Sequence, residues 1–289
     1  MLASMSTNAA TATAHELPME DEDFAFIVKR VKEKAGINLG PHKRNMVYAR
    51  LSRRVRDLGL RSFGAYRERL DGAQGGDEMG VLVNALTTNY TKFFRESHHF
   101  DHFAKDMLPR IIRKAAMKGR RKIRIWSAGC ASGEEAYSIA MVLRQYLPDL
   151  DRWDALILAT DIDTNALAEA EAGIYSAKQV EDIPADFRAK FVRATASPNA
   201  FRIAAHLRPL VVFEWMNLVD RWPMQGPFDA IFCRNVIIYF DGRTQESVVR
   251  RASGLLASHG TLYLGHSESL FGSNCPLQLV GRSTYRKAK

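Results

Sequence analysis

The chain has 289 residues, of which 46% are hydrophobic, and it carries a formal net charge of +9 at pH 7. It is long enough for two domains with a sizeable core. No apolar run approaches the roughly 20 residues that a membrane span needs, so direct membrane insertion is excluded.

The amino terminus, MLASMSTNAATATAHELP, lacks the charged-then-apolar order of a signal peptide. We expect residues 1–19 to form a disordered tail of a cytoplasmic protein. The three cysteines, Cys130, Cys233 and Cys275, are far apart and predict neither a disulfide framework nor a zinc site.

A group of histidines could place two imidazoles on one helical face, at His98, His99 and His102. No carboxylate or cysteine cluster accompanies them in the sequence, and metal sites in proteins usually combine such groups. We therefore expect no metal site.

Positive charge is concentrated between Lys43 and Arg69, where nine Lys or Arg residues face only two acids. Apolar residues recur there at helical spacing, at Val47, Leu51, Val55 and Leu58, opposite Arg50, Arg53 and Arg56. This face is either a solvated helix surface or a docking surface for a polyanion, which could be nucleic acid or an acidic protein helix. Residues 20–95 are expected to form a small helical domain.

The stretch TTNYTKFFRE, Thr87 to Glu96, combines hydroxyl, amide and cationic residues with two adjacent phenylalanines. Such a composition is not that of a core helix. We interpret it as a lid that reaches from the helical domain into a ligand pocket built by the second domain.

After a linker helix over residues 96–117, short apolar runs alternate with helical patterns through the second domain, residues 118–289. The expected strands are KIRIWSAG (122–129), ALILATDID (155–163), LVVFEWMN (210–217), FDAIFCRN (228–235) and GTLYLGH (260–266), with helices at 134–147 and 244–257. This order predicts an α/β fold with a doubly wound, Rossmann-like parallel sheet. In such sheets the ligand lies beyond the carboxyl ends of the strands.

The first expected strand ends in SAGCASGEEAYS, a glycine turn that leads into a helix. Glu134 and Glu135 would repel a dinucleotide pyrophosphate at this helix amino terminus, whereas they suit a cationic ligand. Helical spacing places Glu135 on the inward stripe and Glu134 on the wetter side, which favours Glu135 for contact. Simple capping of the helix by two acids is the alternative.

The second strand ends in ATDIDTNALAEA. Asp161 terminates the strand, where a carboxylate can hold ribose hydroxyls, and Asp163 could cap the next helix. A ligand with a ribose and an adjacent positive charge is S-adenosylmethionine.

Five motifs in this order, LTTNYTKFFRE, WSAGCASGEEAYSIA, TDIDTNALAEAEAGIY, FDAIFCRNVIIYFD and GHSESL, resemble the chemotaxis receptor methyltransferases of the CheR type. The resemblance covers about residues 25–286. It implies S-adenosylmethionine-dependent esterification of glutamate side chains on the helical bundle of a chemoreceptor.

The resemblance also implies which residues form the site. Arg95 would contact the cofactor carboxylate, and Tyr239 would lie beside the transferred methyl group, so these two are the candidate catalytic residues. The implied cofactor-binding set is Asn89, Thr91, Arg95, Glu135, Asp161, Asn217, Leu218, Arg234 and Asn235.

A glutamate side chain is already ionised at neutral pH, because its unperturbed pKa is about 4.3, so the reaction needs no general base. What remains is alignment of donor and acceptor, an effect that can reach roughly 7 to 11 kcal/mol in favourable cases. We expect Arg95 and Arg234 to position groups rather than to exchange protons.

The segment of about residues 175–210 is longer than a simple crossover needs. In the resembled family it is a small antiparallel β subdomain, which in some members grips a receptor carboxyl-terminal peptide with a Gly-x-Gly turn. Here the corresponding residues are Ala194, Thr195 and Ala196. Alanine resists the positive φ that glycine allows, which argues against that docking function.

Two other functions compete with this interpretation. A nucleic-acid methyltransferase would explain the basic helix, but base-amine methylation commonly uses an Asn-Pro-Pro-aromatic turn, and this chain has Arg234-Asn235-Val236 there. We therefore expect no nucleic-acid partner. A non-catalytic binding module is the third alternative.

Overall fold

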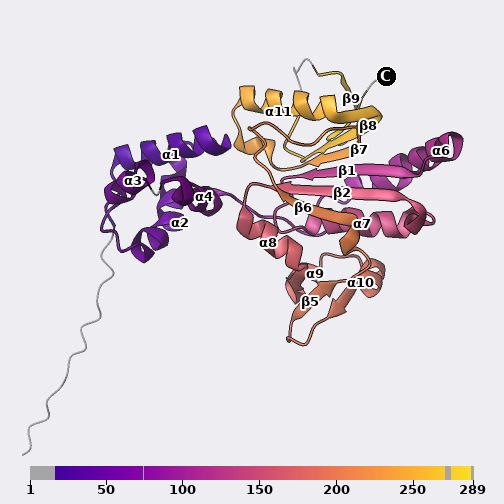
Figure 1. Ribbon diagram of the computed structural model, residues 1–289, viewed down its shortest axis with the longest axis horizontal. Coiled ribbons are helices and arrows are strands. Elements are labelled where there is room, and N and C mark those ends of the chain that lie inside the picture. The colour runs from indigo at the N-terminus through magenta and orange to yellow at the C-terminus, as the bar shows by residue number, and fades with distance from the viewer. Residues whose placement is uncertain (1–16, 74, 271–274, 288–289) are drawn as a thin grey trace, which may run out of the picture.

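The computed structural model describes residues 17–73, 75–270 and 275–287. It contains a helical domain beside an α/β domain, and a smaller β subdomain projects from the α/β domain near α8 (Figure 1). In the described part of the chain, no helix combines the length and the apolar composition that crossing a membrane requires.

The helical domain packs four α-helices and one 3-10 turn around a single core. Its elements are α1 (Asp21–Ala35), η1 (Pro41–Lys43), α2 (Arg44–Asp57), α3 (Phe63–Asp71) and α4 (Gly75–Leu86). Leu17 is buried in this core, and its N–H donates to the Tyr48 hydroxyl. Residues 17–19 therefore pack with the domain, whereas the rest of the expected tail, residues 1–16, lies outside the described residues.

The basic helix α2 forms where the sequence pattern predicts it. The apolar residues Val47, Leu51 and Val55 are fully buried. Gly59 has a φ of 70° and lets the helix end, because its N–H donates to the Arg56 carbonyl and the next N–H, of Leu60, donates to the Val55 carbonyl.

Helices α5 (His98–His102) and α6 (Leu108–Lys118) flank one turn of π-helix, η2 (Phe103–Met107). They run without a break over most of the expected linker helix. Gly119, with a φ of 64°, follows the end of α6.

The central sheet of the α/β domain has the strand order β6-β2-β1-β7-β8-β10-β9. Neighbouring strands from β6 to β8 pair in parallel, whereas β10 pairs antiparallel with both β8 and β9. The strands are β1 (Lys122–Ala128), β2 (Asp154–Asp161), β6 (Val211–Trp215), β7 (Phe228–Cys233), β8 (Leu256–Leu264), β9 (Leu277–Gly281) and β10 (Thr284–Lys287).

Helices cover both faces of this sheet because strand side chains alternate between the faces. In β1, Ile125 packs with the cluster that contains α7 (Glu134–Tyr146) and α5, whereas Trp126 packs with the cluster that contains α11 (Gly242–Leu255). Figure 1 shows α11 and α7 on opposite sides of the strands. The expected doubly wound arrangement is confirmed.

The sequence patterns did not indicate β9 and β10, because these two strands are short and partly polar. The expected helix over 244–257 also runs two residues too far, since β8 already begins at Leu256. These differences lie away from the carboxyl ends of β1, β2, β6 and β7.

The inserted subdomain is a three-stranded antiparallel sheet of order β3-β5-β4. It follows α8 (Thr164–Ala172) and comprises β3 (Ile174–Ser176), α9 (Ala177–Val180), α10 (Ala185–Phe191), β4 (Val192–Ala194) and β5 (Ala200–Ile203). In the turn between β4 and β5 the left-handed residue is Asn199, with a φ of 62°, and Ala194 and Ala196 do not have positive φ values. The turn thus forms without glycine.

Candidate functional site

A cavity of about 370 Å³ lies at the carboxyl ends of the parallel strands and is also lined by the helical domain. Every residue expected to bind the cofactor or to act in catalysis lines it: Asn89, Thr91, Arg95, Glu135, Asp161, Asn217, Leu218, Arg234, Asn235 and Tyr239. The structure therefore brings the whole predicted set together, although their individual roles remain predictions.

The turn after β1 requires its two glycines. Gly129 and Gly133 have φ values of 79° and 93°, and a Cβ on Gly129 would lie 2.3 Å from a methyl group of Val236. A side chain at either position would therefore be strained. The turn places the amino terminus of α7 against the cavity.

Glu135, at this helix terminus, lines the cavity and accepts hydrogen bonds from the Ser127 hydroxyl at 2.7 Å and from Arg234 Nη1 at 3.0 Å. Burial raises the pKa of Glu135, and the Arg234 charge and these hydrogen bonds oppose that rise. The sequence favoured Glu135 over Glu134 for contact with a ligand, and Glu135 is the one of the two that lines the cavity.

Helical spacing suggested that Glu134 lies on the solvent-facing side of α7, but the structure shows it buried. It is only 1% exposed and accepts from the Ser132 hydroxyl at 2.7 Å and from the Gln179 amide at 3.1 Å. The β subdomain covers this side of α7, which the helical pattern alone does not reveal.

Asp161 ends β2 and joins two loops at the cavity wall. Its Oδ2 accepts the Ala131 N–H at 2.8 Å, and its Oδ1 accepts the Asp163 N–H at 3.0 Å. Ala131 has a positive φ of 47°, an unfavourable conformation for alanine that this hydrogen bond helps to hold. Burial raises the pKa of Asp161.

Asp163 caps α8, as expected, by accepting from the backbone of Asn165 and Ala166. Its Oδ2 also accepts from the Thr87 hydroxyl and from the Asn89 amide, each at 2.6 Å. The side-chain amide nitrogen of Asn89 is thus bonded to the protein.

The segment Thr87–Glu96 is held at both ends. Its first residues bond to Asp163, and at its far end Phe93 is buried against Tyr175 while the Phe94 N–H donates to Ser138. The two phenylalanines therefore anchor the segment in the α/β core. The sequence suggested a lid, and the structure shows a strap that crosses between the domains.

Arg95 and Arg234 face the cavity in different ways. Arg95 donates to the Tyr90 carbonyl at 2.9 Å, lies 5.4 Å from the Tyr90 ring centre and has no ion pair among the described residues. Arg234 is buried, pairs with Glu135 at 3.0 Å and with Glu96 at 3.3 Å, and donates to the Arg95 carbonyl. Arg95 is therefore the arginine with donors available to a ligand.

Two of the remaining predicted residues, Asn217 and Tyr239, connect the two domains. Asn217 donates to the Lys34 carbonyl at 2.7 Å, and the Asn38 N–H donates to the Tyr239 carbonyl at 2.8 Å. Asn235 has a φ of 59°, and its amide nitrogen lies 3.4 Å from Glu96 Oε1. Leu218 is buried.

Glu268 is a structural support that sequence reasoning missed, although it lies within the quoted GHSESL motif. Its two carboxylate oxygens accept the backbone N–H groups of Gly265, Asn235, Val236 and Ile238 at 2.6 to 3.2 Å. Burial raises the pKa of Glu268, and the four hydrogen bonds oppose that rise. This carboxylate shapes the segment that carries Arg234 and Tyr239.

Glu96 was also missed. Burial alone would raise the pKa of Glu96, but the hydrogen bond from His266 and the charge of Arg234 outweigh it and hold the pKa at about 2.

Part of the cavity wall was unforeseen as well, because it comes from the helical domain. The residues are Ala35, Ile37, Asn38, Leu39, Gly40, His42, Lys43 and Met46.

The three arginines of the proposed docking surface do not behave alike. Arg53 and Arg56 are exposed, and Arg53 makes only a weak pair with Asp57 at 3.8 Å. Arg50 is half-buried and donates to the Thr87 carbonyl and the Thr88 hydroxyl. Because α2 packs against α4, Arg50 meets the start of the strap and is not a free docking residue.

Comparison with known proteins agrees with this architecture. A family model described as "CheR methyltransferase, all-alpha domain" matches residues 22–87, and one described as "CheR methyltransferase, SAM binding domain" matches residues 89–286. The second match confirms the expectation of S-adenosylmethionine as cofactor.

Relatives match over almost the whole chain. The chain is 42% identical over 270 residues to the chemotaxis protein methyltransferase 2 of Pseudomonas aeruginosa, covering 92% of this chain and 93% of the relative. It is 39% identical over 292 residues to the chemotaxis protein methyltransferase of Salmonella typhimurium, covering 100% and 98%. With both domains matched in order, the chain belongs to the CheR methyltransferase family.

Proposed function

We propose that this methyltransferase forms methyl esters on glutamate side chains of the cytoplasmic helical bundle of a chemoreceptor. The observation that carries the proposal is a cavity with carboxylates at two neighbouring strand ends and a basic helix that leads away from it. The name of these relatives, chemotaxis protein methyltransferase, supports a substrate in chemotaxis signalling.

The cavity fits S-adenosylmethionine because Glu135 and Asp161 are buried carboxylates whose pKa values are raised by burial. A positively charged ligand beside them would stabilise their ionised forms. Glu135 would hold the amino group and Asp161 the ribose, while Arg95 would pair with the carboxylate. When bound, the cofactor supplies an electrophilic methyl group.

The chain's own residues would act mainly by positioning. The substrate carboxylate is ionised at neutral pH and needs no base. Arg95 has donors that the protein does not fully use, whereas Arg234 is engaged by Glu135, Glu96 and the Arg95 carbonyl. We therefore assign Arg234 to holding Glu135 and the strap, and Arg95 and Tyr239 to the groups that react.

The start of α2 borders the cavity, which His42, Lys43 and Met46 line. Arg56 lies ten residues beyond Met46, or about 15 Å along the helix at 1.5 Å per residue. Arg53 and Arg56 could thus contact a long substrate whose reacting glutamate reaches the cavity. A glutamate-rich helical bundle has this length and the complementary charge.

The test of the proposed reaction is transfer of a labelled methyl group from S-adenosylmethionine to membranes that contain candidate chemoreceptors. We expect label on the receptor that is released as methanol by mild base, because methyl esters hydrolyse under those conditions. A receptor whose candidate glutamates are replaced by alanine serves as the control. Base-stable label, or label on added RNA or DNA instead of the receptor, would contradict the proposal.

Substituting Arg53 and Arg56 together with alanine is expected to raise the receptor KM and to flatten its salt dependence, with cofactor affinity unchanged. Attraction between exposed charges is screened over about 8 to 10 Å at ordinary ionic strength, so methylation by the parent protein should slow as salt rises. The measurement is the initial methylation rate against receptor concentration at several salt concentrations.

The matched control is the Arg243→Ala, Arg250→Ala variant, which removes the same charge from the exposed face of α11. Its KM and salt dependence should stay near those of the parent protein. If both double variants change equally, net charge and not α2 governs receptor binding.

A further inference from the structure

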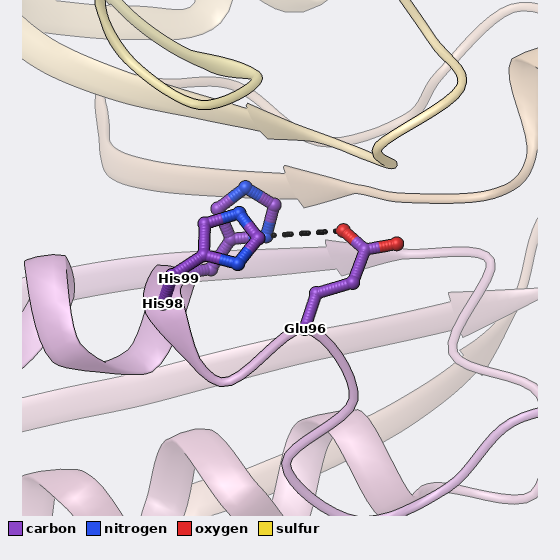
Figure 2. A group of neighbouring side chains, drawn as sticks. All are labelled: Glu96, His98 and His99. Atoms are coloured by element: carbon purple, nitrogen blue, oxygen red, sulfur yellow. Dashed lines mark ion pairs between the residues drawn. The ribbon is translucent and has the colours of Figure 1, made fainter.

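A second group of titratable side chains lies where the strap enters α5. Glu96, His98 and His99 each point one potential metal ligand atom toward the others, and these atoms all lie within 4.8 Å of one another. Figure 2 shows the two imidazole rings one behind the other, with the Glu96 carboxylate facing them. None of the three residues lines the cavity, although Glu96 contacts Arg234 and Asn235, which do.

All three residues of this cluster carry a buried polar atom without a hydrogen-bond partner among the described residues. These atoms are Glu96 Oε2, His98 Nε2 and His99 Nδ1. Leaving a polar atom buried and unpaired is costly, so each such atom requires an explanation. Glu96 Oε2 forms ion-pair contacts with Arg234 Nη2 at 3.3 Å and with His99 Nδ1 at 3.5 Å, and the convergence of all three side chains points to a shared ligand.

His99 makes the need for that partner specific. The ring is completely buried and lies between two acceptors, with Nε2 at 3.0 Å from the Arg282 carbonyl and Nδ1 at 3.5 Å from Glu96 Oε2. When Nε2 donates to the Arg282 carbonyl, Nδ1 faces a carboxylate oxygen, and a proton or a metal ion between these two atoms makes the contact favourable.

We propose that Glu96, His98 and His99 bind a zinc ion. Two imidazole nitrogens and one carboxylate oxygen form a common zinc ligand set, with water in the fourth position. Ligand atoms at about 2.0 to 2.2 Å from a tetrahedral ion lie roughly 3.4 Å apart, close to the 3.5 Å between His99 Nδ1 and Glu96 Oε2.

The surroundings of His99 fit this assignment. Zinc-binding histidines usually donate their other N–H to a carbonyl or carboxylate, which sets the ring orientation. The Arg282 carbonyl accepts in this way from His99 Nε2. Glu96 is likewise oriented, because its Oε1 accepts from the backbone and side chain of His266.

Arg234 opposes a cation at this place, since its Nη2 lies 3.3 Å from Glu96 Oε2. The Arg234 charge is partly neutralised by Glu135, whose carboxylate lies 3.0 Å from Arg234 Nη1. Zinc binding at this place therefore depends on coordination by the two imidazoles as well as on the negative charge of Glu96. The ion would join the end of the strap to α5 and thereby hold the chain next to Arg95.

From the sequence we expected no metal site, because no carboxylate or cysteine cluster accompanies the histidines. Glu96 supplies that carboxylate because its positive φ of 54° turns the chain just before α5. His102 is not part of the cluster, since its nitrogens face the Tyr263 hydroxyl and Asp106.

The test is to strip the full-length protein with a chelator and to titrate it with zinc chloride and, separately, with cobalt chloride. We expect one ion per chain by elemental analysis and a visible absorption band typical of four-coordinate cobalt. At zinc concentrations about 100 times the Kd, the midpoint of thermal unfolding should rise by about 5 °C. None of these readouts depends on methyl transfer.

Two variants separate this cluster from adventitious binding. His98→Ala should abolish stoichiometric binding and the cobalt band, whereas His102→Asn, on the same helix, should retain both. Equal loss in the two variants, or no stoichiometric binding by the parent, would overturn the proposal. Nitrogen NMR provides a further check, because a doubly protonated His99 ring in the metal-free protein at neutral pH would satisfy both acceptors and overturn it too.

Discussion

Replacing Glu268 with alanine is expected to lower the free energy of unfolding by about 4 kcal/mol or more, since each buried donor left without a partner costs roughly 1 to 3 kcal/mol. Four backbone N–H groups lose their acceptor at once, in the segment that carries Arg234 and Tyr239. Urea unfolding followed by circular dichroism measures the loss. Cofactor affinity should fall as well, because this segment forms part of the cavity wall.

Two further variants make the Glu268 experiment specific. Glu268→Gln keeps one acceptor oxygen and should lose about half as much stability as the alanine variant. Ser267→Ala changes an exposed neighbour and should stay within about 0.5 kcal/mol of the parent. If Glu268→Ala were as stable as Ser267→Ala, the carboxylate would not support the segment.

Replacing Asp161 with alanine is expected to weaken binding of S-adenosylhomocysteine by roughly 1.5 to 3 kcal/mol, the scale of hydrogen bonds to a charged group. This corresponds to a loss of about 10- to 150-fold in affinity. Stability should also fall, because the Ala131 and Asp163 N–H groups lose their acceptor. Calorimetry at a temperature where the variant is folded gives the affinity, and NAD should show no binding to either protein.

Asp229 offers the control that separates the two effects. It is a partly buried carboxylate at the start of β7, where it accepts the Arg124 N–H at 3.0 Å, and it does not line the cofactor cavity. Asp229→Ala should therefore reduce stability and leave cofactor affinity unchanged. Normal affinity in Asp161→Ala would remove Asp161 from the cofactor site.

Local sequence was a reliable guide to the architecture because its signals arise from neighbouring residues. Apolar runs that end in Gly129 and Asp161 predict parallel strands, and the carboxyl ends of such strands meet at one edge of the sheet. Strand order along the chain is therefore enough to assign Glu135 and Asp161 to one pocket. The helical spacing of Val47, Leu51 and Val55 likewise identified the buried face of α2.

The partners of individual polar side chains could not be predicted in this way, because they come from segments far apart in the chain. Arg50 is held by the strap, and Glu134 is covered by the β subdomain. Glu268 supports backbone about 30 residues away, a relation that leaves no periodic pattern in the sequence.

The sequence by itself determined the two domains, the doubly wound sheet, the acids at its first two strand ends and the family. Tertiary structure alone decided that the helical domain completes the cavity wall. It also decided that Arg234 pairs with Glu96 and Glu135, whereas Arg95 has no ion pair among the described residues. The physical reason is that periodicity and turn chemistry act over a few residues, whereas burial and the pairing of charges depend on how distant segments pack.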